Sequence, residues 1–186
     1  MKTCVFITGT NAVGKTSVAL NIIERCGGVE RIYDQVTYCS DGKTALAGPY
    51  TSKFGGVDKV KNEKGSSCTS ELPKVVETAL LNAEIVFCEG SFMNTFGLNL
   101  TNAMFKAKEY LVVNLYAPAL TLYERLRNRS NGMNGKVRDM KKILSRQRAA
   151  ALAAKKWESI GVKTIQVDTS THTTEEIVDI IYKYIH

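Results

Sequence analysis

The sequence contains no cysteine pair with CxxC spacing, and its five cysteines are an odd number spread singly along the chain. It has only two histidines, His172 and His186, and both follow residue 170. These patterns exclude a zinc site of familiar spacing and give no sign of a secreted disulfide framework. We therefore expect buried or half-buried thiols in a reducing cytoplasm.

Long apolar runs are also missing. No stretch reaches the roughly 18 apolar residues that a membrane span needs, and the apolar run at residues 3–8 is too short for a signal peptide. We expect a soluble, cytoplasmic protein with no membrane partner.

The chain has 186 residues, of which 44% are hydrophobic and 23% charged. These values are typical of a globular protein with enough core to fold without disulfides or metal, and we expect a single domain over 1–186. The formal charge of +7 is unevenly spread. Residues 106–163 hold 14 Lys and Arg against 4 Asp and Glu, whereas the rest of the chain holds 11 against 14. This basic segment makes an anionic partner plausible.

Short β-branched segments alternate with helical patterns along the whole chain. Strands are expected near 3–8, 31–39, 85–88, 110–116 and 162–167, and helices near 15–25, 70–82, 94–108, 119–129, 137–160 and 174–184. This alternation predicts an α/β fold, a parallel sheet covered by helices on both faces. Asp41-Gly42 offers a tight turn and a possible hairpin, and residues 41–67 are interpreted as an insertion.

The strongest motif is Gly9-Thr10-Asn11-Ala12-Val13-Gly14-Lys15-Thr16, which matches G-x-x-x-x-G-K-[ST] between an expected strand and helix. Its glycines let backbone N–H groups surround phosphate oxygens at a helix N-terminus. Lys15 is expected to reach the β- and γ-phosphates, and the Thr16 hydroxyl to ligate Mg²⁺. The alternative is a glycine-rich turn that matches by chance. The expected nucleotide contacts are Gly9, Asn11, Ala12, Val13, Gly14, Lys15, Thr16 and Ser17.

Two carboxylates are candidates for metal binding and for general-base catalysis beside this loop. Glu89 closes the expected strand 85–88, and functional groups gather at the carboxyl ends of parallel strands. We expect Glu89 to help hold Mg²⁺, the alternative being a solvated acid. Asp34 lies in or after the extended segment 31–39 and is a candidate general base for an acceptor hydroxyl in the same cleft.

Arginines surround the glycine-rich break at 130–135. Arg125, Arg129 and Arg138 fit a small lid over about 125–140, in which guanidinium groups stabilise a transferring phosphoryl group. Arg125 and Arg129 share a helix face at i,i+4 spacing. The competing interpretation is a solvated basic helix face.

The insertion carries aromatic and charged residues among glycines. Tyr50, Lys53, Phe54 and Asp58 are candidate substrate contacts, because an aromatic ring can stack on a base and a lysine can hold a phosphate. The same composition also suits an ordinary Ω-like surface loop.

On these residues the sequence resembles the P-loop nucleoside and nucleotide kinases over most of its length. The matching segments are 9–16, Glu89-Gly90, 115–118, Glu124-Arg125-Leu126, the arginine-bearing lid and Val167-Asp168-Thr169. The resemblance implies a P-loop three-layer sandwich with five parallel strands in the order 2-3-1-4-5, and ATP with Mg²⁺ as cofactors. It also makes Asp168 and Thr169 candidates for contact with the base.

This chain has Glu89-Gly90 where thymidylate kinases carry Asp-Arg and deoxynucleoside kinases carry Glu-Arg-Ser. Residues 46–58 look more like bacteriophage kinases that phosphorylate 5-hydroxymethyluracil within DNA. That resemblance implies DNA as a substrate, along which the basic segment would lie, and a location in the host cytoplasm. Two alternatives stay open: a nucleoside or deoxynucleoside monophosphate kinase, and a P-loop ATPase or switch that binds nucleic acid.

Overall fold

A computed structural model describes residues 2–51, 55–130 and 140–185 of the chain, and the side chains of 129 and 130 lie outside that description. The strands are β1 (Thr3–Thr8), β2 (Val29–Tyr33), β3 (Val36–Cys39), β4 (Thr44–Ala47), β5 (Ile85–Glu89), β6 (Glu109–Tyr116) and β7 (Lys163–Asp168). The helices are α1 (Lys15–Arg25), α2 (Leu72–Asn82), α3 (Leu98–Met104), α4 (Ala119–Ser130), α5 (Met140–Ser159) and α6 (Thr174–Ile185). Two short 3-10 helices, η1 (Val57–Lys59) and η2 (Ser91–Asn94), lie in the connections.

The strands form one seven-stranded sheet in the order β2-β3-β4-β5-β1-β6-β7. The run β4-β5-β1-β6-β7 is parallel throughout. Numbered by their own order along the chain, these five strands follow the order 2-3-1-4-5. The expected α/β fold and its sheet order are therefore confirmed, and the carboxyl ends of the five strands share one edge.

One expected strand is wrong. Residues 31–39 were expected to form one extended segment, but the chain turns at Asp34 and Gln35, whose φ angles are +48° and +64°. The turn makes β2 and β3 an antiparallel hairpin at the sheet edge. The hairpin expected around Asp41-Gly42 does form between β3 and β4. Because β4 is a strand of the parallel core, the irregular segment is shorter than the expected insertion over 41–67.

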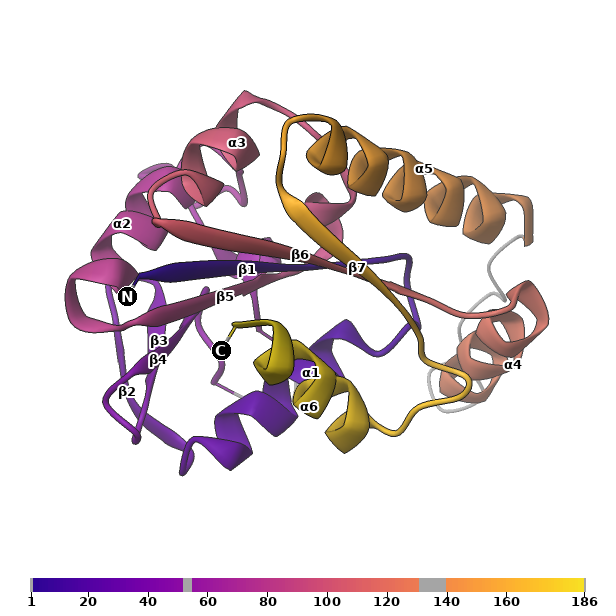
Figure 1. Ribbon diagram of the computed structural model, residues 1–186, viewed down its shortest axis with the longest axis horizontal. Coiled ribbons are helices and arrows are strands. Elements are labelled where there is room, and N and C mark those ends of the chain that lie inside the picture. The colour runs from indigo at the N-terminus through magenta and orange to yellow at the C-terminus, as the bar shows by residue number, and fades with distance from the viewer. Residues whose placement is uncertain (1, 52–54, 131–139, 186) are drawn as a thin grey trace.

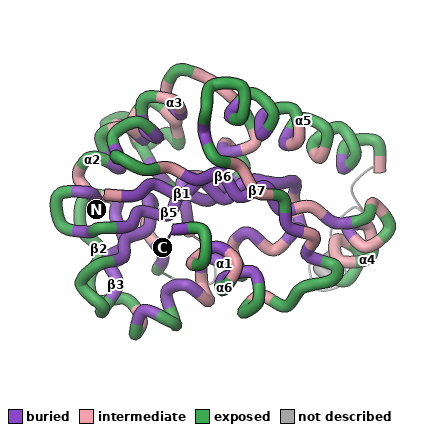
Figure 2. The backbone as a smooth tube through the Cα atoms, viewed as in Figure 1, coloured by how far each residue is buried: buried purple, intermediate pink, exposed green. Residues whose placement is uncertain are grey.

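Helices cover both faces of the sheet (Figure 1). One apolar cluster joins the β1, β4 and β5 strands to α2, α3 and α5, and a second joins the opposite face to α1 and α6. The central strands are buried along their length, whereas β2 is exposed at the edge (Figure 2). Within the described residues, no helix is both long and apolar enough to cross a bilayer.

Trp157 of α5 is fully buried and fixes that helix to the sheet. Its ring meets Phe6 of β1 edge-on with centroids 5.6 Å apart, and meets Phe96, just after η2, at 4.8 Å. Edge-on aromatic pairs at these distances are favourable beyond the area that they bury. The contact places α5 beside the segment that follows β5 at the carboxyl edge of the sheet.

Candidate functional site

The glycine-rich loop between β1 and α1 has the geometry that its motif requires. A Cβ on Gly9 would lie 2.3 Å from the carbonyl oxygen of Leu115, so the loop can approach β6 only without a side chain there. Gly14 caps α1 with φ +94°, and Ala12 is held at φ +66°, a region that non-glycine residues rarely adopt. Such backbone strain is found where surrounding structure fixes a functional loop.

Lys15 lies inside this loop. Its Nζ donates hydrogen bonds to the carbonyl oxygens of Gly9 at 2.7 Å and Thr10 at 3.1 Å, and the residue is 8% exposed. A buried ammonium group at the N-terminus of α1, beside backbone N–H groups, creates a position that favours an anion.

Glu89 ends β5, next to Ile7 of β1, and is 2% exposed. Both of its carboxylate oxygens lie 3.5 Å from Thr16 Oγ1, and Oε1 accepts a hydrogen bond of 2.8 Å from the Tyr50 hydroxyl. Burial raises the pKa of Glu89, and the Tyr50 hydrogen bond and the Lys15 charge act in the opposite direction. Burial and the charge of Glu89 raise the pKa of Tyr50 well above its usual value, so the phenol remains a donor.

The pair of Thr16 and Glu89 fits the requirements of Mg²⁺. This ion prefers oxygen ligands in an octahedral shell with bonds of about 2.0–2.1 Å, in which neighbouring ligand atoms lie about 3.0 Å apart. The 3.5 Å between Thr16 Oγ1 and the Glu89 oxygens is close to that separation. In the described parts of the chain, no group of three or more His, Cys, Asp or Glu side chains could hold a metal ion. Mg²⁺ in kinases is commonly bound by one or two protein groups together with substrate phosphates.

The segment that follows β4 is pressed against Glu89. A Cβ on Gly56, whose φ is +86°, would lie 2.5 Å from both the Glu89 carbonyl oxygen and Oε1. A Cβ on Gly48 would lie 2.0 Å from the Gly56 carbonyl oxygen. Asp58 accepts hydrogen bonds from the backbone N–H groups of Ser91 at 2.8 and 2.9 Å and of Phe92 at 3.3 Å. The glycines thus allow close packing around the carboxylate.

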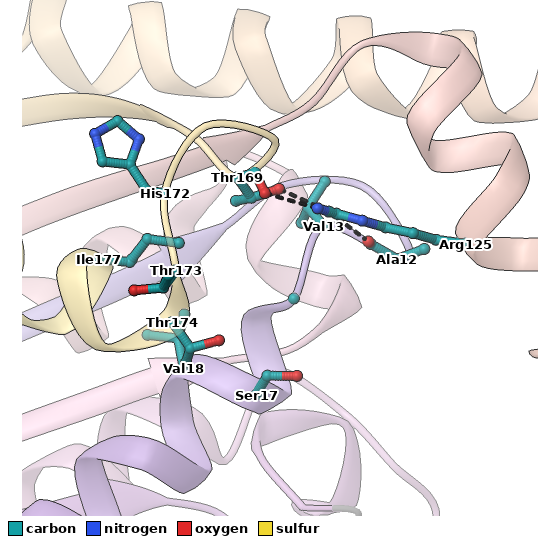
Figure 3. A pocket seen from close by; sticks show the side chains of 11 residues that line it. Ala12, Val13, Ser17, Val18, Arg125, Thr169, His172, Thr173, Thr174 and Ile177 are labelled. Carbon is teal, nitrogen blue, oxygen red and sulfur yellow. Dashed lines mark hydrogen bonds between the residues drawn. The ribbon is translucent and has the colours of Figure 1, made fainter.

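A hollow of about 230 Å³ lies beside the glycine-rich loop, and none of its lining residues belongs to the segment 48–58. Figure 3 shows its wall, in which Arg125 reaches from α4 to the loop after β7. The Arg125 guanidinium donates to Thr169 Oγ1 at 2.8 Å, to the Thr169 carbonyl at 2.6 Å and to the Ala12 carbonyl at 3.4 Å. The lining residues are Ala12, Val13, Gly14, Ser17, Val18, Arg125, Thr169, His172, Thr173, Thr174 and Ile177.

The structure brings together the residues of the glycine-rich loop, Glu89, Tyr50, Asp58 and Arg125. Tyr50 is only 5% exposed and faces Glu89, so its ring is not presented for stacking on a base. Asp34 lies in the exposed β2–β3 turn, where it lines a small depression beside α2 with Glu71 and Lys74. The sequence analysis assigned Asp34 to an extended segment over 31–39, whereas the residue lies in the turn that separates β2 from β3.

Other expected site residues are only partly described. The Asp168 carboxylate accepts hydrogen bonds from Ser170 N at 2.8 Å and Ser170 Oγ at 2.6 Å. These bonds, the side-chain one first, lower the pKa of Asp168. Its neighbour Thr169, not Asp168, lines the hollow. Lys53, Phe54 and Arg138, with the centre of the expected lid, lie outside the described residues, as does the Arg129 side chain.

Sequence reasoning missed Asn94 and His172. Asn94 Oδ1 accepts a 2.7 Å hydrogen bond from the N–H of Gly9, which fixes the start of the glycine-rich loop to η2. His172 lines the hollow, and its Nδ1 lies 2.9 Å from the Asp168 carbonyl oxygen. The only signal for either was position, since each follows the carboxyl end of a core strand.

Comparison with models of known protein families finds no match, and comparison with curated proteins finds none. Solved structures do match. The YorR protein of Bacillus subtilis, in complex with phosphorylated GDP, is 16% identical with a TM-score of 0.61, and the match covers 98% of this chain and 95% of that one. A sugar kinase from Janibacter sp. HTCC2649 is 14% identical with a TM-score of 0.53, covering 100% and 94%. A deoxyadenosine kinase from M. mycoides with bound dCTP is 12% identical with a TM-score of 0.52, covering 98% of each chain. At these identities the likeness establishes the fold, which is the mainly parallel α/β fold of P-loop kinases.

Proposed function

We propose that this chain is a phosphotransferase that uses ATP and Mg²⁺ to phosphorylate a nucleotide-type acceptor. The observation that carries the proposal is the buried carboxylate of Glu89, held opposite Thr16 of a complete phosphate-binding loop. A lone phosphate-binding loop indicates nucleotide binding only. A carboxylate positioned at 3.5 Å from its threonine adds the means to place a metal on the phosphates to be transferred.

The donor nucleotide is assigned to the loop and the adjoining hollow. The β- and γ-phosphates would lie in the loop formed by residues 9–16, with the nucleoside toward Arg125 and Thr169. Lys15, now bonded to two loop carbonyls, has an ammonium group within reach of those phosphates. The 230 Å³ hollow is of a size that a nucleoside portion can occupy in part.

Each residue then has a distinct part in transfer. Backbone N–H groups of the loop and Lys15 hold the donor phosphates, and Thr16 with Glu89 would hold Mg²⁺, which neutralises charge on those phosphates when bound. Arg125 ties the loop to the segment after β7 and so keeps the donor site in shape. Arg129 and Arg138 are proposed to stabilise the charge of the transferring group, and Asp58 to border the acceptor beside Ser91.

The favoured acceptor is the hydroxymethyl group of 5-hydroxymethyluracil in DNA. Helix α5 supports this choice, because it carries several exposed basic side chains and a single acidic one, Glu158. Its exposed basic residues are Lys141, Lys142, Arg146, Arg148, Lys155 and Lys156. Phosphate contacts of this kind supply most of the affinity for DNA. Since Trp157 fixes α5 beside η2, DNA along this helix would run past the carboxyl end of β5, with the target base turned out of the stack.

A free nucleoside or deoxynucleoside monophosphate is the second candidate acceptor. It is favoured by the structural likeness to a deoxyadenosine kinase. In that case the basic face of α5 would not take part in acceptor binding. A P-loop ATPase that binds nucleic acid is the third candidate, and it requires no acceptor.

The test is transfer of label from γ-labelled ATP to matched acceptors: DNA with 5-hydroxymethyluracil, the same DNA with thymine, and free nucleosides and monophosphates. Label on the modified DNA alone supports the favoured acceptor, and label on small nucleotides alone supports the second. Hydrolysis that no acceptor changes would contradict the phosphotransferase proposal.

A charge-reversal pair tests the role of α5 in the same assay. Arg148→Glu with Lys155→Glu, which lie on one helix face at i,i+7, should weaken binding to DNA and reduce the slope of log affinity against log salt by about 2. Lys43→Glu with Lys183→Glu carries the same change in net charge on exposed positions elsewhere. This control should leave the slope unchanged, and equal slopes in both variants would contradict the docking of DNA on α5.

A further inference from the structure

The buried tyrosine of the segment after β4 has a role that neither the motif nor the fold assigns. Tyr50 lies 39 residues before Glu89 in the chain, and its hydroxyl donates a 2.8 Å hydrogen bond to Glu89 Oε1. We propose that Tyr50 is a positioning residue, which holds the Glu89 carboxylate in the orientation that receives a metal-bound nucleotide. This inference rests on the proposed function, since it concerns the same site.

The phenol ring itself is fixed from two sides. The backbone N–H of Tyr50 donates a hydrogen bond to Thr37 Oγ1 at 2.9 Å, and the Thr37 hydroxyl in turn donates to the Gly48 carbonyl at 2.9 Å. A Cβ on Gly55 would lie 2.4 Å from the Tyr50 ring, so the backbone at Gly55 closes over the ring at van der Waals distance. Thr37 and Tyr50 are both buried. A side chain anchored in this way can direct its hydroxyl to one place only.

Within the described parts of the chain, the Glu89 carboxylate is restrained by few groups other than Tyr50. Thr16 Oγ1 lies 3.5 Å from both oxygens, at the limit of a hydrogen bond and therefore a weak restraint. The Gly56 backbone limits movement of the carboxylate on one side. Among the described residues, the Tyr50 hydroxyl thus makes the shortest side-chain hydrogen bond to the Glu89 carboxylate, and it leaves both oxygens directed toward Thr16.

Groups that orient a metal-binding side chain have a characteristic effect when removed. Losing such a hydrogen bond typically weakens metal affinity or activity by about 10- to 100-fold while the ligand itself remains. Substituting a residue that only packs in the core changes stability, but it affects the binding of nucleotide with metal and without metal equally. This difference separates a positioning role from a structural one.

The test is Tyr50→Phe, which removes the hydroxyl and keeps the ring against Gly55. Binding of ADP is measured by titration calorimetry with and without Mg²⁺, and the phosphotransferase rate is measured across a range of Mg²⁺ concentrations. The matched control is Tyr38→Phe, because Tyr38 is also buried in the sheet and its hydroxyl donates a hydrogen bond of 3.4 Å to the Thr78 carbonyl.

Mg²⁺ should increase the affinity for ADP about 10- to 100-fold less in Tyr50→Phe than in the unaltered protein. The affinity for ADP without metal should be unchanged. The Mg²⁺ concentration for half-maximal rate should rise, and the rate at saturating Mg²⁺ should stay near that of the unaltered protein. Tyr38→Phe should match the unaltered protein in every one of these measurements.

A double-mutant cycle with Glu89→Gln keeps the test independent of folding yield. If Tyr50 acts through Glu89, adding Tyr50→Phe to Glu89→Gln changes Mg²⁺-dependent binding little further. Additive effects would overturn the inference, as would an equal loss of ADP affinity with and without metal, or an unaltered protein whose ADP binding ignores Mg²⁺. An unaltered protein that binds Mg²⁺-ADP through this pair but transfers no phosphate refutes the proposed function and leaves the role of Tyr50 intact.

Discussion

A single added methyl group at Gly56 tests how closely the segment after β4 is fitted to the candidate site. Gly56 has φ +86° and ψ −173°, a conformation open almost only to glycine. Its Cβ would lie 2.5 Å from Glu89 Oε1, and must move by at least 0.5 Å to reach the 3.0 Å that real Cβ contacts respect. Gly56→Ala therefore displaces the carboxylate or the segment itself.

The expected size follows from two separate costs. The backbone conformation contributes about 1–3 kcal/mol, and overpacking against Glu89 contributes about 1–3 kcal/mol more. Gly65 provides the matched control, since its φ is +78° but nothing lies within 4 Å of the position of its Cβ. Gly65→Ala has the conformational cost alone, so Gly56→Ala should be the less stable of the two by about 1–3 kcal/mol.

Urea unfolding followed by circular dichroism gives the two free energies, and the phosphotransferase rate under native conditions gives the functional effect. A displacement approaching 1 Å at a reacting group can cost about 100-fold in rate. We expect a loss of at least about 10-fold for Gly56→Ala and little change for Gly65→Ala. Equal stability losses in the two variants, or a fully active Gly56→Ala, would refute the argument that this segment shapes the site.

Three further predictions concern other parts of the molecule. Burial raises the pKa of Glu89 above the ordinary value of 4.5. The folded protein therefore loses stability as the pH rises through this raised pKa, because the buried carboxyl group must then ionise. Glu89→Gln should therefore raise the melting temperature relative to the unaltered protein increasingly as the pH rises above the ordinary carboxyl pKa of 4.5, while transfer is lost; a pH-independent difference speaks against it. Arg125→Met removes hydrogen bonds to Thr169 and Ala12, and should weaken ADP binding by about 10-fold or more in calorimetry, whereas an unchanged affinity would show that these bonds do not shape the donor site. Trp157→Ala empties a fully buried site and should cost about 3–5 kcal/mol in urea unfolding; a loss below about 1 kcal/mol would contradict the packing of α5 described above.

Much of the fold was predictable because its signals are local. The phosphate-binding loop is contiguous from Gly9 to Thr16, and the alternation of apolar strands and helices needs only neighbouring residues. The β2–β3 hairpin was not predictable, because Asp34-Gln35 lacks the glycine that usually marks such a turn and stands between apolar residues suited to a strand. The strand propensity of the flanking residues favoured a continuous strand, whereas in the structure the chain reverses its direction at this point.

The arrangement around Glu89 lies further beyond sequence reasoning. Its strand-end position was readable, but the approach of Tyr50 joins segments 39 residues apart and that of Thr16 joins segments 73 residues apart. The glycines at 55 and 56 gave a signal for a loop and not for close packing on a carboxylate. Such contacts depend on the order of strands in the sheet, which brings β4, β5 and β1 side by side.

The measurement that tests the central claim most directly compares the unaltered protein with Lys15→Ala, using γ-labelled ATP, Mg²⁺ and the acceptor set described above. The account predicts that the unaltered protein places label on a nucleotide-type acceptor. It predicts that Lys15→Ala, folded by circular dichroism, places none, because the ammonium group proposed to hold the donor phosphates is gone. Label found only as inorganic phosphate, or equal transfer by both proteins, would contradict the account.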